Sequence, residues 1–80
     1  MEITGTVTYV ELEGGFWGII GDTGKRYALG DFPEGERWRD QHVRATVRRV
    51  SGVSVRMWGV EVDVVSIAPF ISAAPSEPST

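Results

Sequence analysis

The chain has 80 residues, of which 41% are hydrophobic, and its formal net charge at pH 7 is −3. It holds no cysteine, which excludes a disulfide framework, thiol catalysis and a thiolate metal site. No apolar run approaches the roughly 20 residues of a membrane-spanning helix, and the first residues lack both a basic and an apolar stretch, so we expect one cytoplasmic domain without membrane contact.

The first predicted strand covers residues 3–9, where apolar residues and threonines alternate with the period of two of a half-buried strand. The face expected to point inward carries Ile3, Gly5, Val7 and Tyr9. Val10 has the opposite parity, so we expect a twist or bulge near Tyr9 that returns Val10 to the core. Gly5 lies inside the strand, which indicates a bend or a closely approaching backbone.

Two glycine-containing turns, at residues 13–15 and 22–25, flank a second predicted strand over residues 16–21. Glycine tolerates the positive φ angles that tight hairpin turns need, so these segments indicate an antiparallel meander. A third strand is expected over residues 25–29. The second strand carries bulky apolar side chains on both faces, and the pattern therefore leaves open which face is buried.

The longest connection spans residues 30–41 and contains two glycines and a proline, so we expect a loop with one helical turn after Pro33. Phe32 and Trp38 are the large apolar residues of this loop. We expect them to close one end of the core.

A strand is predicted over residues 42–50, with Val43, Ala45 and Val47 facing inward and His42, Arg44, Thr46 and Arg48 facing outward. Residues 53–57 and 60–67 alternate in the same way and complete the sheet. Proline and serine then dominate. We therefore expect a barrel domain over residues 1–68 and a disordered tail over residues 69–80.

No helix-period segment of useful length exists, and short strands with turn signals fill most of the chain, which indicates an all-β fold. In so small a domain, a closed barrel removes most exposed strand edges. Five to six strands with the longest connection after the third predict an OB-like barrel. The alternative is an SH3-like barrel.

The turn motifs form a recognisable pattern: Glu-Gly-Gly-Phe-Trp-Gly-Ile at residues 13–19, Asp-Thr-Gly-Lys-Arg-Tyr at residues 22–27 and Met-Trp-Gly at residues 57–59. This pattern resembles a group of small prokaryotic OB-fold-like proteins whose activity is uncharacterised. The resemblance covers about residues 3–68. It implies a fold and carries no activity, because its motifs are turn glycines and aromatic residues.

The residues favour no catalytic chemistry. His42 is the single histidine, it follows a loop acid, Asp40, and no serine stands in a nucleophile-elbow context. Two pairs of carboxylates spaced i, i+2 occur, Glu11 with Glu13 and Glu61 with Asp63, but such pairs usually form a solvated edge and not a metal site. We therefore expect no enzyme activity, no metal and no cofactor.

The charges are distributed unevenly. All eight basic residues lie within residues 25–56, which together carry a net charge of +4, and the remainder of the chain carries −7. The basic segment predicts either an anion-facing surface or merely the solvated outer faces of two strands.

A binding surface needs exposed aromatic rings and cations, and the sequence offers both. The candidate binding residues are Trp17, Arg26, Tyr27, Arg44, Arg48 and Trp58, with Lys25 and Arg56 as further cations. OB-like barrels bind ligands on the face of their second and third strands, and we expect Trp17 and Arg26 to lie close together on the surface there. For each aromatic residue, the alternative is a place in the core.

We expect a non-catalytic binding module whose partner is another protein or a second copy of the chain, because exposed tryptophan near arginine is typical of interface hot spots and free strand edges can add a partner strand. The alternative is single-stranded nucleic acid, whose bases stack on aromatic rings. The acidic net charge disfavours that alternative, because phosphate neutralisation supplies most of such affinity. An oligosaccharide stacked on Trp17 or Trp58 is a third possibility.

Overall fold

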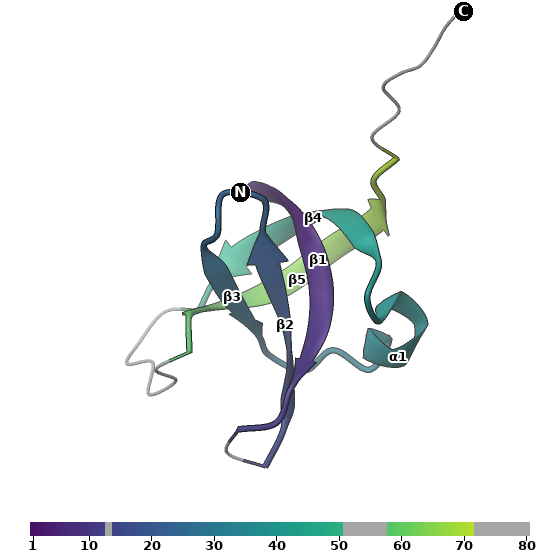
Figure 1. Cartoon of the computed structure of the whole chain (residues 1–80). Helices are drawn as coiled ribbons and strands as arrows, with labels where there is room; N and C mark the ends of the chain where they lie inside the picture. The colour runs from purple at the N-terminus through teal and green to yellow at the C-terminus, as the bar shows by residue number, and fades with distance from the viewer. Residues whose placement is uncertain (13, 51–57, 72–80) are drawn as a thin grey trace, which may run out of the picture.

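The chain folds into a closed five-stranded β-barrel (Figure 1), seen here in a computed structural model that describes residues 1–12, 14–50 and 58–71. Its elements are β1 (Glu2–Val10), β2 (Phe16–Gly21), β3 (Arg26–Leu29), α1 (Gly35–Trp38), β4 (His42–Arg49) and β5 (Val60–Pro69). The predicted all-β class is confirmed, and so is the single helical turn after Pro33. No helix in the described part of the chain is long and apolar enough to cross a membrane.

The strands follow the order β1-β2-β3-β5-β4, and the barrel closes through pairing of β4 with β1. All pairs are antiparallel except β3 with β5, which run parallel over three residue pairs. A closed five-stranded barrel of this order, with its helical turn between β3 and β4, is OB-like, so the SH3-like alternative is not adopted.

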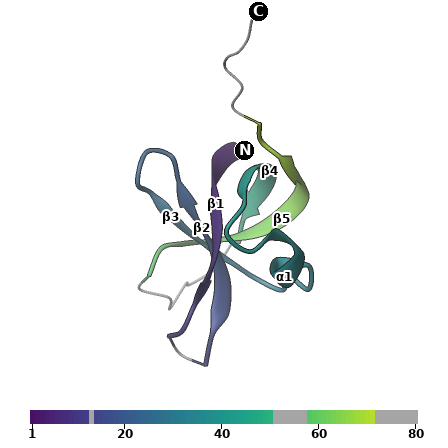
Figure 2. The same cartoon turned by 45° about the vertical axis from the view of Figure 1, so that its right-hand side comes forward.

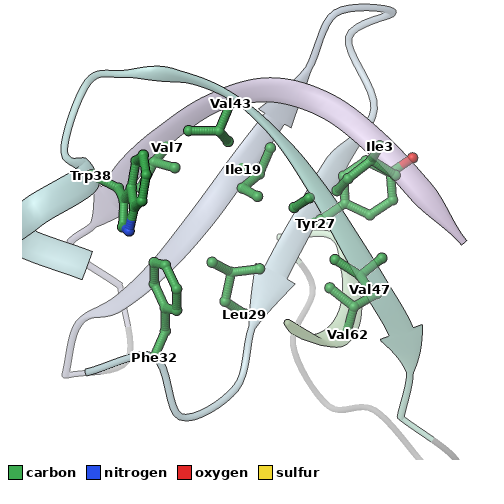
Figure 3. Packing of buried hydrophobic residues seen from close by; sticks show 11 residues of the cluster. Ile3, Val7, Ile19, Tyr27, Leu29, Phe32, Trp38, Val43, Val47 and Val62 are labelled. Atoms are coloured by element: carbon green, nitrogen blue, oxygen red, sulfur yellow. The ribbon is translucent and has the colours of Figure 1, made fainter. Parts of the chain in front are cut away.

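Inward-facing residues of all five strands build one core (Figure 3). Phe32 and Trp38 lie together at the end of this core beside α1, whereas Ile3 and Tyr27 lie at the other end. The inward residues predicted for β4, namely Val43, Ala45 and Val47, are all buried. The expectation that Phe32 and Trp38 close one end of the core is thus confirmed.

β1 and β2 extend past the barrel as a hairpin (Figure 1), and here the sheet buries its outer face. Val10 and Phe16 pair across the two strands and form a second apolar cluster with Ala28, against which Trp58 packs. Of the twist or bulge predicted near Tyr9, the bulge does not form, because β1 and β2 pair without a register shift. Val10 is buried on the opposite side of the sheet from Val7, so a second cluster explains the change of parity.

Gly5 marks a close approach of two backbones, as its place inside β1 predicted. A Cβ atom there would collide with the carbonyl oxygen of Ile20 and come within 2.8 Å of the Cα atom of Gly21. Only glycine fits at this crossing of β1 and β2.

β5 contains an irregularity and runs longer than expected. Thr46 pairs with Ser66 and Val47 pairs with Val64, so Val65 is the extra residue of a β-bulge. Pairing with β4 continues to Pro69, and the amide of Phe70 donates to the carbonyl of His42 at 2.9 Å. The barrel therefore reaches past the predicted boundary at residue 68. The strand expected over residues 53–57 and the tail over residues 72–80 lie outside the described residues.

Candidate binding surfaces

The six candidate binding residues do not form one surface. The barrel distributes them over the core, the outer face of β2 and β3, the inner side of the extended hairpin and the outer face of β4. Arg26, Arg44 and Arg48 are exposed, Trp17 and Trp58 are half-buried, and Tyr27 is buried. Arg56 lies outside the described residues.

Tyr27 belongs to the core, so its prediction as a stacking platform is wrong. It pairs with Ile19 across β2 and β3, both side chains point into the barrel, and Tyr27 keeps 8% of its surface exposed (Figure 3). Tyr27 has the same parity as Leu29, which is fully buried. That shared parity was the signal in the sequence, because residues two apart on a strand share a face.

Trp17 and Arg26 lie on opposite faces of the sheet, so the prediction that they are close together is also wrong. The register pairs Arg26 with Ile20, three positions from Trp17, and this odd separation places them on opposite sides. Arg26 points outward, and Trp17 turns toward α1, where it covers Gly35.

The partners of Trp17 are Tyr9 and Arg39. The Tyr9 and Trp17 rings meet edge to face at a centroid distance of 5.0 Å, and the Arg39 guanidinium lies 5.2 Å from the Trp17 ring and 5.7 Å from the Tyr9 ring. Arg39 also forms a salt bridge with Glu36 at 2.9 Å, which lowers the pKa of that carboxyl. Arg39 was not among the candidates, and no local signal points to it, because it reaches Trp17 only through the tertiary fold.

The outer face of β2 and β3 brings two aromatic rings and a cation together. We call this site the Trp58 patch and define it as Phe16, Gly18, Arg26 and Trp58. The Trp58 ring lies directly over Gly18, where a Cβ atom would come within 2.6 Å of it. The Phe16 ring meets Trp58 edge to face at 5.7 Å, and the Arg26 guanidinium lies 5.7 Å from the Trp58 ring. Trp58 is thus held against the sheet by these contacts while part of its surface stays open to solvent.

Exposed residues extend the Trp58 patch along the same face. Thr6, Ile20 and Arg26 form one row across β1, β2 and β3, because Thr6 pairs with Ile20 and Ile20 pairs with Arg26. Ile20 is 43% exposed, which is unusual for a large apolar side chain in a strand. The face therefore combines an aromatic ring, an aliphatic side chain and a cation.

Arg44 and Arg48 lie on the outer face of β4, which pairs with β1 and β5 and not with β2 or β3. The Arg44 guanidinium lies 5.0 Å from the Phe70 ring, so part of its surface packs on that ring. These two cations therefore do not belong to the Trp58 patch. Their predicted position on the outer face of the strand over residues 42–50 is confirmed.

His42 pairs with Asp22 and not with the nearby Asp40. Its Nε2 donates to the Asp22 carboxylate, with both oxygens at 3.0 Å, and its ring meets Phe70 edge to face at 5.0 Å. The hydrogen bond from His42, followed by one from Thr4, lowers the pKa of Asp22. No group of three or more metal-binding side chains gathers in the described part of the chain.

We expect the Asp22 carboxyl to titrate below its ordinary range, and replacement of His42 with alanine to move its pKa back up. Because the pKa of Asp22 is lowered in the folded state, the pair stabilises the fold above pH ~4, and this stabilisation is lost as the pH falls through the lowered pKa. Carboxyl chemical shifts followed by NMR measure both titrations. The Glu36 carboxyl is the internal control, because its pKa is lowered by Arg39 and should not respond to His42. An unchanged Asp22 titration in the variant would contradict this assignment.

We compared the chain with models of known protein families, with curated proteins and with solved structures, and none of the three comparisons found a match. The resemblance of its turn motifs to small prokaryotic OB-fold-like proteins therefore stays a prediction.

Proposed function

We propose that this protein is a non-catalytic binding module that recognises a protein partner through the Trp58 patch. The observation that carries the proposal is the fixed Trp58 ring, which lies on Gly18 with Phe16 at its edge and Arg26 beside it. The outer face of the second and third strands is also where OB-like barrels commonly bind their ligands.

The chemistry of the Trp58 patch favours a protein surface. Tryptophan and arginine are enriched among the residues that contribute most to protein–protein affinity. Trp58 is already held by its neighbours, so a partner would lose little side-chain entropy in ordering it. The exposed Ile20 beside it adds aliphatic surface that a protein partner can bury.

The distribution of charge favours the same class of partner. Arg44 and Arg48 lie on a different face from Arg26, so these three cations do not form the row that follows a phosphate backbone. The net charge of −3 also opposes a polyanion. A protein partner requires no such excess of positive charge.

The experiment places a photo-crosslinking residue at position 20, at the rim of the Trp58 patch, and at position 48 as the control on β4. A partner trapped from position 20 alone is then purified and its affinity is measured for wild-type and variant proteins. We expect Trp58→Ala to weaken binding by at least about 30-fold, the equivalent of about 2 kcal/mol for a hot-spot residue. Arg48→Ala, a substitution on another face, should have no effect.

A second variant protects this test against misfolding. Arg26 is exposed, so Arg26→Ala should leave the fold intact and still weaken the complex. Equal affinities of wild type, Arg26→Ala and a folded Trp58→Ala variant would refute the proposal. Absence of any partner crosslinked through position 20 would also count against it.

Single-stranded nucleic acid is the second candidate, favoured by the contact between the Trp58 ring and Arg26, since a stacking platform beside a cation suits a base and its phosphate. Tryptophan fluorescence with mixed-sequence oligonucleotides at two salt concentrations tests it. Quenching that weakens steeply with salt and disappears in Trp58→Ala supports nucleic acid, and an unchanged signal at low salt excludes it. The cytoplasmic location and the lack of enzyme activity stay predictions.

A further inference from the structure

A groove separates β5 from the connection between β3 and α1, away from the Trp58 patch. It has a volume of about 410 Å³ and is lined by residues 31–34 on one side and residues 64–67 on the other. None of its lining residues belongs to the Trp58 patch.

One wall of this groove, which we call the β5 groove, is an incompletely paired strand. β3 has four residues and pairs with β5 only at Val60, Glu61 and Val62, whereas β5 continues to Pro69. Beyond Val62, pairing within the described residues involves β4 alone. Residues 64–67 therefore offer a free backbone edge, and an extended polypeptide can pair with such an edge.

The walls of the β5 groove are apolar. Phe32 and Pro33 stand opposite Val64, Val65 and Ile67, and both Val64 and Ile67 also pack against the core. Val65, the bulge residue, is 61% exposed, the largest exposed fraction among the large apolar residues within the described strands. An apolar side chain of a bound peptide would cover this surface.

The rim of the β5 groove is acidic. Asp31 and Glu34 are both exposed, and neither forms an ion pair within the described part of the chain. A second copy of the chain would bring two such pairs of carboxylates together, which disfavours self-association here. A basic partner would instead neutralise them.

We propose that the β5 groove binds an extended peptide segment with alternating apolar and basic residues. The segment pairs its backbone with residues 64–67, its apolar side chains cover Val65 and Pro33, and its basic side chains face Asp31 and Glu34. Alternation is required because successive side chains of a strand point to opposite sides. The bulge at Val65 interrupts the edge, so a short segment fits better than a long, flat strand.

The probe is a short capped peptide of alternating lysine and valine, titrated into the ¹⁵N-labelled full chain and followed by amide chemical shifts. We expect saturable shifts of the amides of Asp31, Phe32, Glu34 and residues 64–67, with the amides of the Trp58 patch unchanged. Two matched peptides serve as controls. One carries glutamate in place of lysine, and the other carries N-methyl groups on the backbone of its valines. Both should bind at least about tenfold more weakly, because one loses the charge match and the other loses backbone pairing.

Variants of the protein separate local from general electrostatics. Asp31→Asn with Glu34→Gln should weaken the lysine–valine peptide about fivefold, the size expected for two exposed charge pairs. Glu2→Gln with Glu11→Gln makes the same change of net charge elsewhere and should leave affinity nearly unchanged. Val65→Lys should block the groove, while Ile20→Lys, on the outer face of β2, should not.

Four results would overturn the proposal: shifts centred outside the β5 groove, equal affinity for the N-methylated peptide, equal losses in the two doubly neutralised variants, or no saturable binding. Concentration-dependent shifts of residues 64–67 without any peptide would assign the groove to a second copy of the chain instead. The substitutions at residues 31, 34 and 65 leave the Trp58 patch untouched, so its own test stands or fails separately.

Discussion

Replacement of Leu29 with alanine is expected to lower the free energy of unfolding by about 3 kcal/mol. Leu29 is fully buried in β3, at the point where β3 meets β5, and its side chain packs within the main core (Figure 3). Removal of its methyl groups leaves a cavity that the closed barrel cannot collapse around. A domain of this size has a total stability of only about 4–12 kcal/mol, so the loss is a large fraction.

Urea unfolding followed by tryptophan fluorescence measures this change, with a matched control in the same chain. Leu12 lies beyond the end of β1 and is 52% exposed, so Leu12→Ala should cost less than about 0.5 kcal/mol. Similar losses for the two leucines would mean that the core is not the one described. If the urea concentration at half-unfolding changes but the slope of the unfolding free energy against urea concentration does not, the substitution affects stability alone.

Replacement of Gly5 with alanine is the second large effect, and we expect a loss of about 3 kcal/mol, at the upper end for overpacking. The added methyl group would meet the carbonyl oxygen of Ile20 and the Cα atom of Gly21. Both are backbone atoms of β2, so no side chain can rotate away. The register between β1 and β2 is fixed by the surrounding pairs, and the strands would have to separate.

Gly24→Ala is the control for Gly5→Ala, because it isolates conformational strain from contact. Gly24 has a φ of 92° in the turn before β3, and a Cβ atom there would meet nothing within 4 Å. Its substitution should cost about 1 kcal/mol from the left-handed backbone alone. Thermal unfolding of the two variants gives the comparison. A smaller loss at Gly5 than at Gly24 would contradict the close crossing of β1 and β2.

The sequence predicted the elements whose side chains alternate plainly. β4 shows one apolar and one polar face, and its inward residues were identified correctly. Phe32 and Trp38 were expected to close one end of the core because they are the large apolar residues of their loop, and both lie in the core. The local sequence was sufficient in both cases, because these apolar side chains all enter the same core.

Local pattern failed where the sheet buries both faces. β2 carries Phe16 and Ile19 at opposite parities, and the structure uses Phe16 in the outer cluster and Ile19 in the main core. A single strand cannot reveal that a second cluster exists, because the residues that complete it come from other elements. A twist or bulge was accordingly expected near Tyr9 to bring Val10 to the core, and no bulge forms.

The candidate site was only partly predictable for a related reason. Trp58 and Arg26 were both named, but their contact depends on where the chain returns to the barrel after β4. The same holds for Asp22 and His42, which lie 20 positions apart. Residue type identified which side chains can bind, and only the tertiary arrangement decided which of them meet.

The parallel pairing of β3 with β5 has a kinetic consequence. β1, β2 and β3 follow one another through short turns (Figure 2), whereas Tyr27 and Val60, which pair, stand 33 positions apart in the chain. The pairing of β1 with β4 closes still longer loops, since Thr6 pairs with His42, 36 positions away. Closing such loops costs entropy that only the finished barrel recovers, so we expect both seams to form after the meander and to open before it. Pulsed hydrogen exchange should then find the amides of the three-stranded meander protected before those of β5.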